Sequence, residues 1–344
     1  MKKLLNTLYI TSPDAWVHRD GETVEIQLQG NKVGKLPVHG LESIVCMGYN
    51  VLMSPAVMEL CASQGVSMVY LNQNGRFQAR VEGPLSGNVL LRKEQYRISD
   101  EESRALPIAK ACVAAKIQNS RSNLMRHLRN HQNTDGKEDI EKAINRLAIL
   151  LKEAQDSATL DELRGYEGIC ADEYFSVFDH MIVAQKNDFR FLKRSRRPPL
   201  DRVNALLSFL YVLLAHSCRS ALESVGLDPA VGFLHRDRPG RPSLALDLLE
   251  EFRHPIADRL VLSLINLQTV QAKDFIIGPT GAVEMSDDAR KTILQTWQKR
   301  KLDEVMHPYL EETISLGLFF HVQAQLLART IRGDMKYYPA YMNR

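Results

Sequence analysis

The sequence has few of the features that mark secreted, zinc-binding or membrane-spanning proteins. Five cysteines are scattered along 344 residues without a CxxC pair, which argues against a disulfide framework and a zinc knuckle. No window approaches 18 uncharged apolar residues, and the N-terminal stretch turns polar too soon for a signal peptide. We therefore expect a cytoplasmic protein that does not enter the membrane.

Two apparent nucleotide-handling motifs lack their essential parts. His235-Arg236-Asp237 imitates the catalytic loop of protein kinases, but Pro242 stands where that loop needs asparagine, and no DFG follows. The stretch GPTGAVEMS has no Gly-Lys-Ser/Thr and is not a P-loop. Neither a kinase nor a P-loop enzyme is indicated.

The N-terminal residues, 1–83, have the pattern of a β-domain. Short, often alternating runs are separated by turn signals, and their tight spacing favours an antiparallel β-sandwich over a parallel sheet. A single helix should begin at Ser54-Pro55 and end at Gly65, and Asn74-Gly75 signals a hairpin. The predicted strands cover residues 7–10, 15–19, 23–29, 32–38, 43–48, 66–71 and 77–81.

Composition changes after Gly83-Pro84, and residues 90–344 are predicted to form a larger all-α domain. The chain is thus expected to be an α+β protein of two domains. Ser286 should cap the helix that carries Trp297, and the aromatic C-terminal end is interpreted as a mobile or partner-docking tail, with base stacking as the alternative. The predicted elements are helices over 107–130, 140–155, 159–184 and 201–225 and a hairpin over 275–285.

The stretch GFLHRDRPGRPSLALDLLEEFR is a candidate metal site. It places His235 at the end of an apolar run, and Asp247 and Glu250 three residues apart on one face of a helix. Carboxylates on a partly apolar face need a cation, and imidazole with carboxylate suits Mn²⁺ or Mg²⁺. The alternative is a buried histidine beside a solvated acidic helix start.

A second candidate lies in LRGYEGICADEYF. Glu167 falls on the apolar stripe that contains Leu163 and Cys170, so its carboxylate should be buried or in a cleft. Gly165 and Gly168 flank it, and glycines inside a helix usually indicate the close approach of another backbone or a ligand. The alternative is a glutamate paired with a core arginine.

One further polar residue and two basic clusters complete the candidate residues. Asn204 lies one turn into an apolar helix, either as a satisfied core amide or in support of a nearby site. Basic clusters flank the candidate site and indicate a phosphate backbone, although a single cluster is usually only a solvated turn. The predicted DNA-binding residues are Arg190, Lys193, Arg194, Arg196, Arg197, Arg236, Arg238 and Arg241.

The order of four motifs carries a family resemblance. LRGYEGICADEYF, RRPPLDRVNALLSFLYVLL, GLDPAVGFLH and SLALDLLEEFR together resemble the first core CRISPR-associated protein, the integrase of spacer acquisition. The likeness covers essentially the whole chain and is greatest to the subtype I-C branch. It implies that Glu167, His235 and Glu250 are metal ligands, that Asp247 is the neighbouring acidic residue, and that Asn204 is an active-site asparagine. Glu250 stands where some branches have aspartate.

The resemblance also implies an activity and partners. Such proteins dimerise through the β-domain, and two dimers bind a dimer of the second core CRISPR adaptation protein. With Mg²⁺ or Mn²⁺ they join the 3′-hydroxyl ends of a short prespacer duplex to a CRISPR repeat by transesterification, and they also cut DNA. Two alternatives remain open, a general repair or junction nuclease and a non-catalytic DNA-binding scaffold.

Overall fold

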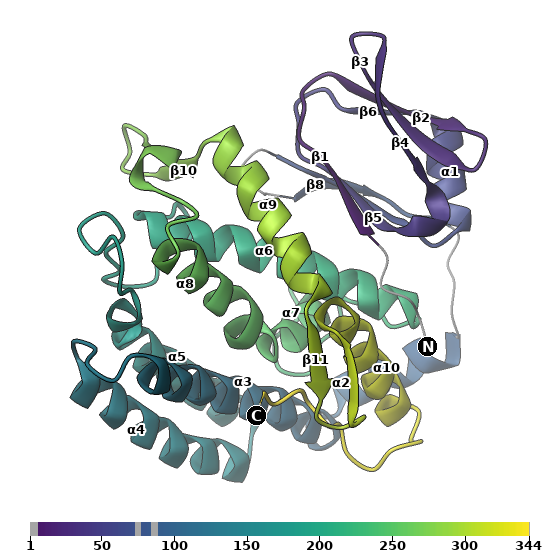
Figure 1. Cartoon of the computed structure of the whole chain (residues 1–344). Coiled ribbons are helices and arrows are strands. Elements are labelled where there is room, and N and C mark those ends of the chain that lie inside the picture. Colours follow the sequence, from purple (N-terminus) through teal and green to yellow (C-terminus); the bar gives the residue numbers. More distant parts are fainter. Residues whose placement is uncertain (1–5, 73–76, 84–88, 344) are drawn as a thin grey trace. The chain divides into compact units, whose positions relative to one another are not determined.

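The chain folds into two compact units, and the computed structural model describes residues 6–72, 77–83 and 89–343. The first unit comprises Met1–Ser86, Asp287–Glu304 and Ser315–Leu318. The second comprises Gly87–Ser286, Val305–Ile314 and Phe319–Arg344. The first is rich in strands and the second in helices (Figure 1), so the protein belongs to the α+β class.

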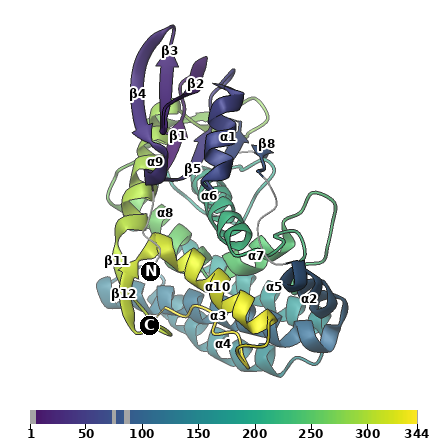
Figure 2. The ribbon, with the colours of Figure 1, turned by 90° about the vertical axis from the view of Figure 1, so that its right-hand side faces the viewer.

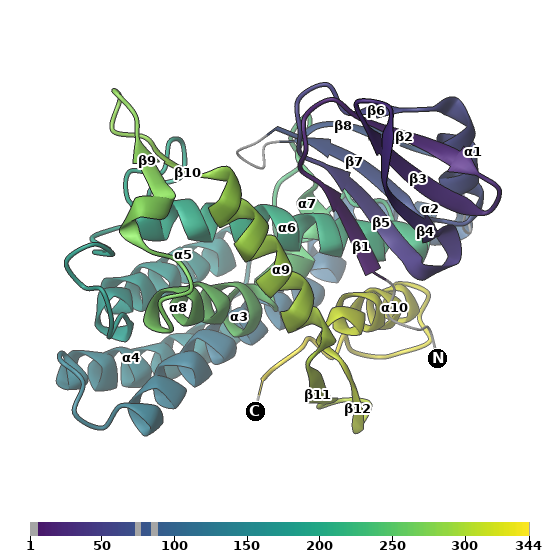
Figure 3. The same ribbon diagram turned by 45° about the horizontal axis from the view of Figure 1, so that its top comes forward.

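Two four-stranded sheets form the first unit. One has the order β1-β5-β7-β8 and the other the order β4-β3-β2-β6 (Figure 3). The expected strands all form, and the hairpin signal Asn74-Gly75 lies outside the described residues. The strands are β1 (Asn6–Ile10), β2 (Ala15–Asp20), β3 (Thr23–Leu28), β4 (Asn31–Pro37), β5 (Leu41–Cys46), β6 (Leu52–Met53), β7 (Ser67–Leu71) and β8 (Phe77–Val81).

The prediction of a purely antiparallel sandwich is wrong. β2–β3, β3–β4 and β7–β8 pair antiparallel, whereas β1–β5, β5–β7 and β2–β6 pair parallel. Parallel neighbours require a crossover connection, and helix α1 (Pro55–Ser63) supplies one between β5 and β7. Strand spacing alone cannot reveal which strands become neighbours.

Alternating side chains and one helix build the core of this unit. In β2, Ala15 and Val17 are buried, whereas Trp16 between them is exposed. Buried residues from both sheets and from α1 form one hydrophobic cluster. The α1 N-terminus is as predicted, because the Ser54 side chain accepts a hydrogen bond from the Val57 amide at 3.4 Å.

Helix α9 (Asp287–Leu302) packs with the first unit, although it lies far along the sequence. Trp297 is fully buried, Gln298 Nε2 donates to the Thr7 carbonyl, and Lys301 Nζ lies 3.3 Å from Glu42 Oε2. The predicted helical domain of residues 90–344 therefore differs from the second unit. The periodicity of residues 287–302 predicts a helix, but periodicity does not show which part of the chain that helix packs against.

Helices make up most of the second unit. Helices α3, α4 and α5 pack against one another, and α10 packs against α6 and α2 (Figure 2). The expected hairpin over 275–285 forms as β9 (Phe275–Ile277) and β10 (Val283–Met285), and a second hairpin joins β11 (Glu304–His307) to β12 (Glu312–Ser315). The helices are α2 (Val89–Asp100), α3 (Glu102–Asn130), α4 (Lys137–Asp156), α5 (Leu160–Ser176), α6 (Arg202–Ser224), α7 (Ser243–Glu250), α8 (Arg259–Asn266) and α10 (Phe319–Ile331).

Two expectations for this unit need correction. The helix predicted over residues 159–184 ends at Ser176, and a 3-10 turn, Phe178–Met181, follows. Asp179 in that turn accepts a hydrogen bond from the Phe191 amide at 2.7 Å and so directs the chain away from the helix axis. The C-terminal end is not a mobile tail, because Tyr338 and Tyr341 are buried.

Helix α6 is the most apolar long helix of the described chain. Asp201 caps it as predicted, accepting a hydrogen bond from the Asn204 amide at 2.7 Å. By length and composition α6 is the one described helix that could cross a membrane, contrary to the expectation of no such window. It packs against α7 and α10, and burial in the core accounts for its hydropathy.

Candidate functional site

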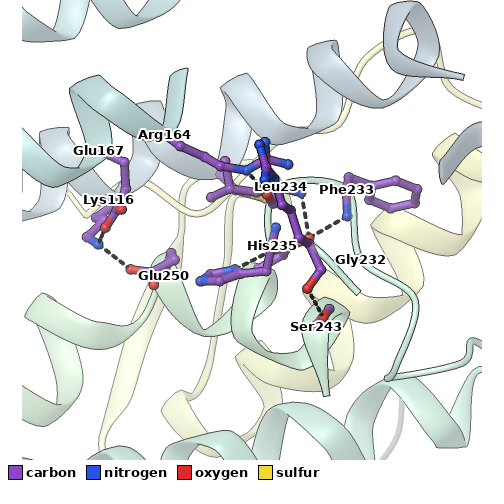
Figure 4. A network of polar contacts seen from close by, with 12 residues as sticks. Lys116, Arg164, Glu167, Gly232, Phe233, Leu234, His235, Ser243 and Glu250 are labelled. Carbon is purple, nitrogen blue, oxygen red and sulfur yellow. Dashed lines mark hydrogen bonds and ion pairs between the residues drawn. The ribbon is translucent and has the colours of Figure 1, made fainter. Parts of the chain in front are cut away.

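Three helices of the second unit bring a lysine between two carboxylates. Lys116 of α3 contacts Glu167 of α5, and its Nζ lies 2.8 Å from Oε2 of Glu250, the last residue of α7 (Figure 4). Lys116 and Glu250 are each 2% exposed, whereas the Glu167 side chain is 27% exposed. The cluster is therefore buried on one side and open to solvent at Glu167.

Helix α5 positions Glu167 as the sequence pattern predicts. Thr159 caps the helix, and Leu163, Cys170 and Tyr174 bury its apolar stripe. Of the two expectations for Gly165 and Gly168, the approach of another backbone is not seen, because a Cβ built at either position meets no atom of another described element within 4 Å, and the approach of a ligand stays a prediction. The helix surface beside Glu167 is thus left open.

His235 is held by Asp247. Its Nδ1 lies 2.6 Å from Asp247 Oδ1, and Oδ2 of the same carboxylate accepts hydrogen bonds from the Phe233 and Leu234 amides. This pairing orients the ring and leaves Nε2 as the nitrogen for an external ligand. In Figure 4 the ring points toward Glu250.

The loop before His235 approaches α7 closely. A Cβ at Gly232 would lie 2.8 Å from Asp247 Oδ2 and 2.9 Å from the Ser243 carbonyl carbon, so only glycine fits there. On the other side, Arg164 Nε of α5 donates to the Leu234 carbonyl at 2.6 Å. The helix that carries Glu167 and the loop that carries His235 are therefore joined directly.

Glu250 is a buried carboxylate that remains ionised. Burial alone would raise its pKa, but the charges of Arg253, Lys116 and His235 outweigh that effect and lower the pKa. Arg253 Nη2 lies 3.1 Å from Oε1. The site therefore stabilises negative charge at Glu250, which is the charge state that a cation requires.

A π-helical segment, Arg253–Asp258, begins three residues after Glu250 and supports it. The Arg253 guanidinium lies 4.7 Å from the centroid of the Tyr211 ring, and Tyr211 Oη donates to Asp258 Oδ1 at 2.6 Å. His254 Nδ1 lies 2.7 Å from the other oxygen of Asp258. Tyr211, itself held by Asp258, therefore packs against Arg253 and keeps its guanidinium beside Glu250.

Asn204 reaches the site only indirectly, because its partner Arg194 lies over the same Tyr211 ring as Arg253. Its Oδ1 accepts from Arg194 Nη1 at 2.5 Å and from the Ser195 amide at 3.0 Å, and its Nδ2 donates to the Lys193 carbonyl at 2.8 Å. No contact between described residues joins Asn204 to Glu167, His235 or Glu250. In this structure it holds the basic segment, residues 190–197, to α6.

The predicted DNA-binding residues fall into two groups. Arg194 is half-buried and bound to Asn204, and Arg241 is also half-buried. Arg236 is exposed and pairs with Asp161 at 2.6 Å. The other side chains are exposed cations: Arg190, Lys193, Arg196, Arg197 and Arg238.

A metal ion would compete with Lys116. Among the described residues, no group of three or more His, Cys, Asp or Glu side chains is already spaced to hold a metal. The donor types nevertheless fit a hard divalent cation, since two carboxylates meet at Lys116 and the His235 ring points toward one of them, Glu250 (Figure 4). Glu250 Oε2 is buried and has the Lys116 ammonium as its close partner at 2.8 Å.

Sequence reasoning missed Lys116 and Arg253. Lys116 carried a readable signal, because it lies four residues after Cys112 and three before Asn119, both buried on α3. A lysine on a buried stripe must meet an anion. Arg253 gave no such signal, because it stands in the charged stretch EEFR, which is typical of a solvent-exposed turn.

Sequence comparisons identify close relatives of the chain. The model of the family described as CRISPR associated protein Cas1 matches residues 8–299. A CRISPR-associated endonuclease Cas1 of Chlorobaculum tepidum is 50% identical over 345 residues and covers 100% of both chains. Another from Rhodospirillum rubrum is 51% identical over 345 residues and covers 99% of both.

Solved structures share the fold at lower identity. A CAS1 protein from Thermotoga maritima has a TM-score of 0.81 at 21% identity, over 98% of this chain and 100% of that one. A casposase bound to integration product has a TM-score of 0.84 at 22% identity, over 99% and 95%. A Cas6-RT-Cas1–Cas2 complex has a TM-score of 0.84 at 20% identity, over 100% of this chain and 37% of that one.

Proposed function

The chain belongs to the family of CRISPR-associated Cas1 endonucleases, and on this premise we propose that it is the integrase of CRISPR adaptation. In the proposed reaction it joins the 3′-hydroxyl ends of a prespacer duplex to the repeat of a CRISPR array by transesterification. The observation that carries this proposal is the meeting of Glu167 and Glu250 at one cation, Lys116, with the His235 ring pointing toward Glu250 (Figure 4).

Each side chain has a distinct part in this proposal. Glu167, Glu250 and His235 Nε2 would hold Mg²⁺ or Mn²⁺ once Lys116 withdraws. A divalent ion there would lower the pKa of the attacking 3′-hydroxyl, polarise the phosphoryl oxygen and stabilise the leaving oxygen. Asp247 holds the His235 ring through Nδ1, which leaves Nε2 for this contact.

Transesterification needs no covalent enzyme intermediate, so positioning is the main task of the protein. The exposed cations of the basic segment would bind phosphates and fix the DNA without reading its sequence. The opening at Glu167 and the uncovered α5 surface at Gly165 and Gly168 give a backbone room to approach. Burial of Glu250 limits access of bulk water from the other side.

The partners proposed here are DNA, a second copy of the chain and the second core adaptation protein. Support comes from structures with the same fold, one titled as a casposase bound to integration product and another as a complex that contains Cas1 and Cas2. We also propose a cytoplasmic location and membership of the subtype I-C branch. The branch proposal rests on the resemblance of the N-terminal start and of the C-terminal stretch SLGLFFHVQAQLLARTIRGD.

A strand-transfer assay tests the proposed function. A duplex with 3′-hydroxyl ends is incubated with a plasmid that carries the repeat, with Mn²⁺ or with chelator, and joined products are counted. Glu167→Gln, His235→Ala and Glu250→Gln should each abolish joining and cutting while DNA affinity stays nearly unchanged, because phosphate contacts supply the binding. Asp172→Asn, an exposed change on the same helix, is the matched control.

The same assay separates the alternatives. A general repair or junction nuclease would cut DNA with the same residues and join no ends. A non-catalytic scaffold would bind DNA and show no dependence on Mn²⁺ in either reaction. Full joining activity in Glu250→Gln would remove Glu250 from the proposed ligands.

A further inference from the structure

The residue next to Glu250 is the anchor of the C-terminal segment. Glu251 is fully buried, and both of its carboxylate oxygens accept hydrogen bonds. Tyr338 Oη donates to Oε1 at 2.5 Å, and the Tyr341 amide and Gln323 Nε2 donate to Oε2 at 2.6 and 2.8 Å. Two of these three donors come from residues 338–343, which we call the C-terminal strap.

A second anchor joins the strap to α3. Asn119 Nδ2 donates to the carbonyls of Glu251 and Tyr341 at 2.7 and 2.8 Å, and Asn119 Oδ1 accepts from the Asn343 amide at 2.7 Å. Asn119 lies three residues after Lys116 on the same helix. The strap, which Figure 2 draws beside α3 and α10, therefore reaches the helix turns that carry Glu250 and Lys116.

The end of a helix needs such support. The last four carbonyl groups of an α-helix have no partner within the helix, and helix ends fray. Helix α7 ends at Glu250, and the Asn119 side-chain amide donates to the carbonyl of Glu251, the residue that caps this end. The rings of Phe252 and Tyr341 stack with their centroids 5.6 Å apart and close the contact from the apolar side.

We propose that the C-terminal strap is a positioning element for the Glu250 carboxylate and its Lys116 counter-ion. The strap acts through its hydrogen bonds to Glu251 and Asn119, which hold these two residues in place. Among the described residues, no contact joins the strap to Glu167 or His235. The part of this inference that concerns metal affinity rests on the proposed function. The part that concerns the rigidity of α7 does not.

Tyr338→Phe tests the strap with minimal change of shape. It removes the hydroxyl donor to Glu251 and keeps the ring. Tyr337→Phe is the matched control, because Tyr337 is the adjacent residue, is 68% exposed and does not contact Glu251. The melting temperature of each full-length variant is measured first. Amide hydrogen exchange at residues 247–252, Mn²⁺ affinity by calorimetry, and kcat and KM for strand transfer are then measured at a temperature at which both variants are folded.

Loss of the hydrogen bond to the buried Glu251 carboxyl should speed exchange at residues 247–252 by up to about tenfold in Tyr338→Phe and leave it unchanged in Tyr337→Phe. Mn²⁺ affinity and kcat should fall by about 10–100-fold, as is typical when a group that orients a metal ligand is lost. KM for DNA should stay the same, since the strap contacts no residue of the basic segment.

Two results would overturn the inference. Unchanged exchange in Tyr338→Phe would show that α7 does not depend on the strap. A lower melting temperature with wild-type Mn²⁺ affinity and kcat would show that the strap only stabilises the fold. If the wild-type protein binds no Mn²⁺, the proposed function fails, and the exchange comparison still decides whether the strap holds α7.

Discussion

Lys116 and Glu250 form an ion pair in the interior of the second unit, with Nζ 2.8 Å from Oε2 and each side chain 2% exposed. The same ammonium contacts Glu167, so one lysine pairs with both carboxylates, and Arg253, 3.1 Å from Glu250 Oε1, supplies a second positive charge. A buried ion pair is costly to break by removal of one partner, because the other charge is left without compensation. The pair thus stabilises the metal-free site and competes with any cation that binds there.

This competition predicts the behaviour of Lys116→Met. Removal of the ammonium should destabilise the metal-free protein by about 3–5 kcal/mol, and Mn²⁺ should then raise the melting temperature more than it does in wild type. Calorimetric melting with Mn²⁺ and with chelator measures both effects. Lys110→Met, also on α3, is the control, and an equal Mn²⁺ shift in the two variants would contradict competition at the site.

Asp247 and Glu250 should differ sharply when each is replaced by its amide. Asp247→Asn keeps the ligands in place and loses part of the support of His235, so we expect activity about 10–100-fold below wild type that rises with Mn²⁺ concentration. Glu250→Gln should have no measurable turnover at any Mn²⁺ concentration. Strand-transfer rates over a Mn²⁺ series make the comparison. A metal-bound structure with Asp247 coordinated and Glu250 turned away would reverse the assignment.

Asp247 should also stabilise the fold, and this contribution can be measured in the absence of metal. Its Oδ2 accepts two amide hydrogen bonds from the loop before His235. In Asp247→Asn an amide NH₂ can face those donors, so we expect a loss of about 1–3 kcal/mol in the free energy of unfolding. Urea denaturation in the presence of chelator measures it, with Asp237→Asn, an exposed change in the same loop, as control.

Substitutions in the basic segment, residues 190–197, should affect DNA binding at exposed positions and protein stability at half-buried ones. Arg197→Glu should weaken DNA binding and lower the slope of log affinity against log salt by about 0.9 for each phosphate that the protein no longer neutralises. Arg194→Gln should mainly destabilise the fold, because Arg194 donates to Asn204 and Ser195. Binding titrations over a salt series test this, with Arg126→Glu, an exposed change on α3, as control. If the slope of log affinity against log salt is unchanged in Arg197→Glu, the segment is a solvated turn that does not contact phosphates.

His127 should make stability depend on pH. Burial, together with the charges of His131, His180 and Lys186, lowers its pKa from 6.5 to about 4. The unfolded chain therefore takes up a proton first, so the contribution of neutral His127 is complete above pH 6.5 and is lost as the pH falls toward about 4. Denaturation midpoints from pH 7 to 4 should fall less in His127→Gln than in wild type. The exposed His39→Gln should follow the wild-type curve.

The amino-acid sequence by itself determined the local elements. The strands of the first unit, the caps at Ser54 and Asp201 and the β9–β10 hairpin all form where alternation, capping residues and turn signals place them. These features depend on side chains only a few positions apart, which is why one sequence suffices to find them. The marked positions Glu167, His235, Asp247 and Glu250 likewise stood out as polar groups on otherwise apolar faces.

Only the tertiary structure decided which of these elements meet. In the structure β1 pairs with β5, and β5 with β7, in parallel. Helix α9 belongs to the first unit, and Lys116 lies between Glu167 and Glu250. The C-terminal tyrosines are also bound to Glu251, where the sequence suggested a free tail. A buried charge shows that a partner must exist, because an isolated one is too costly, but the free energy of folding the whole chain selects that partner.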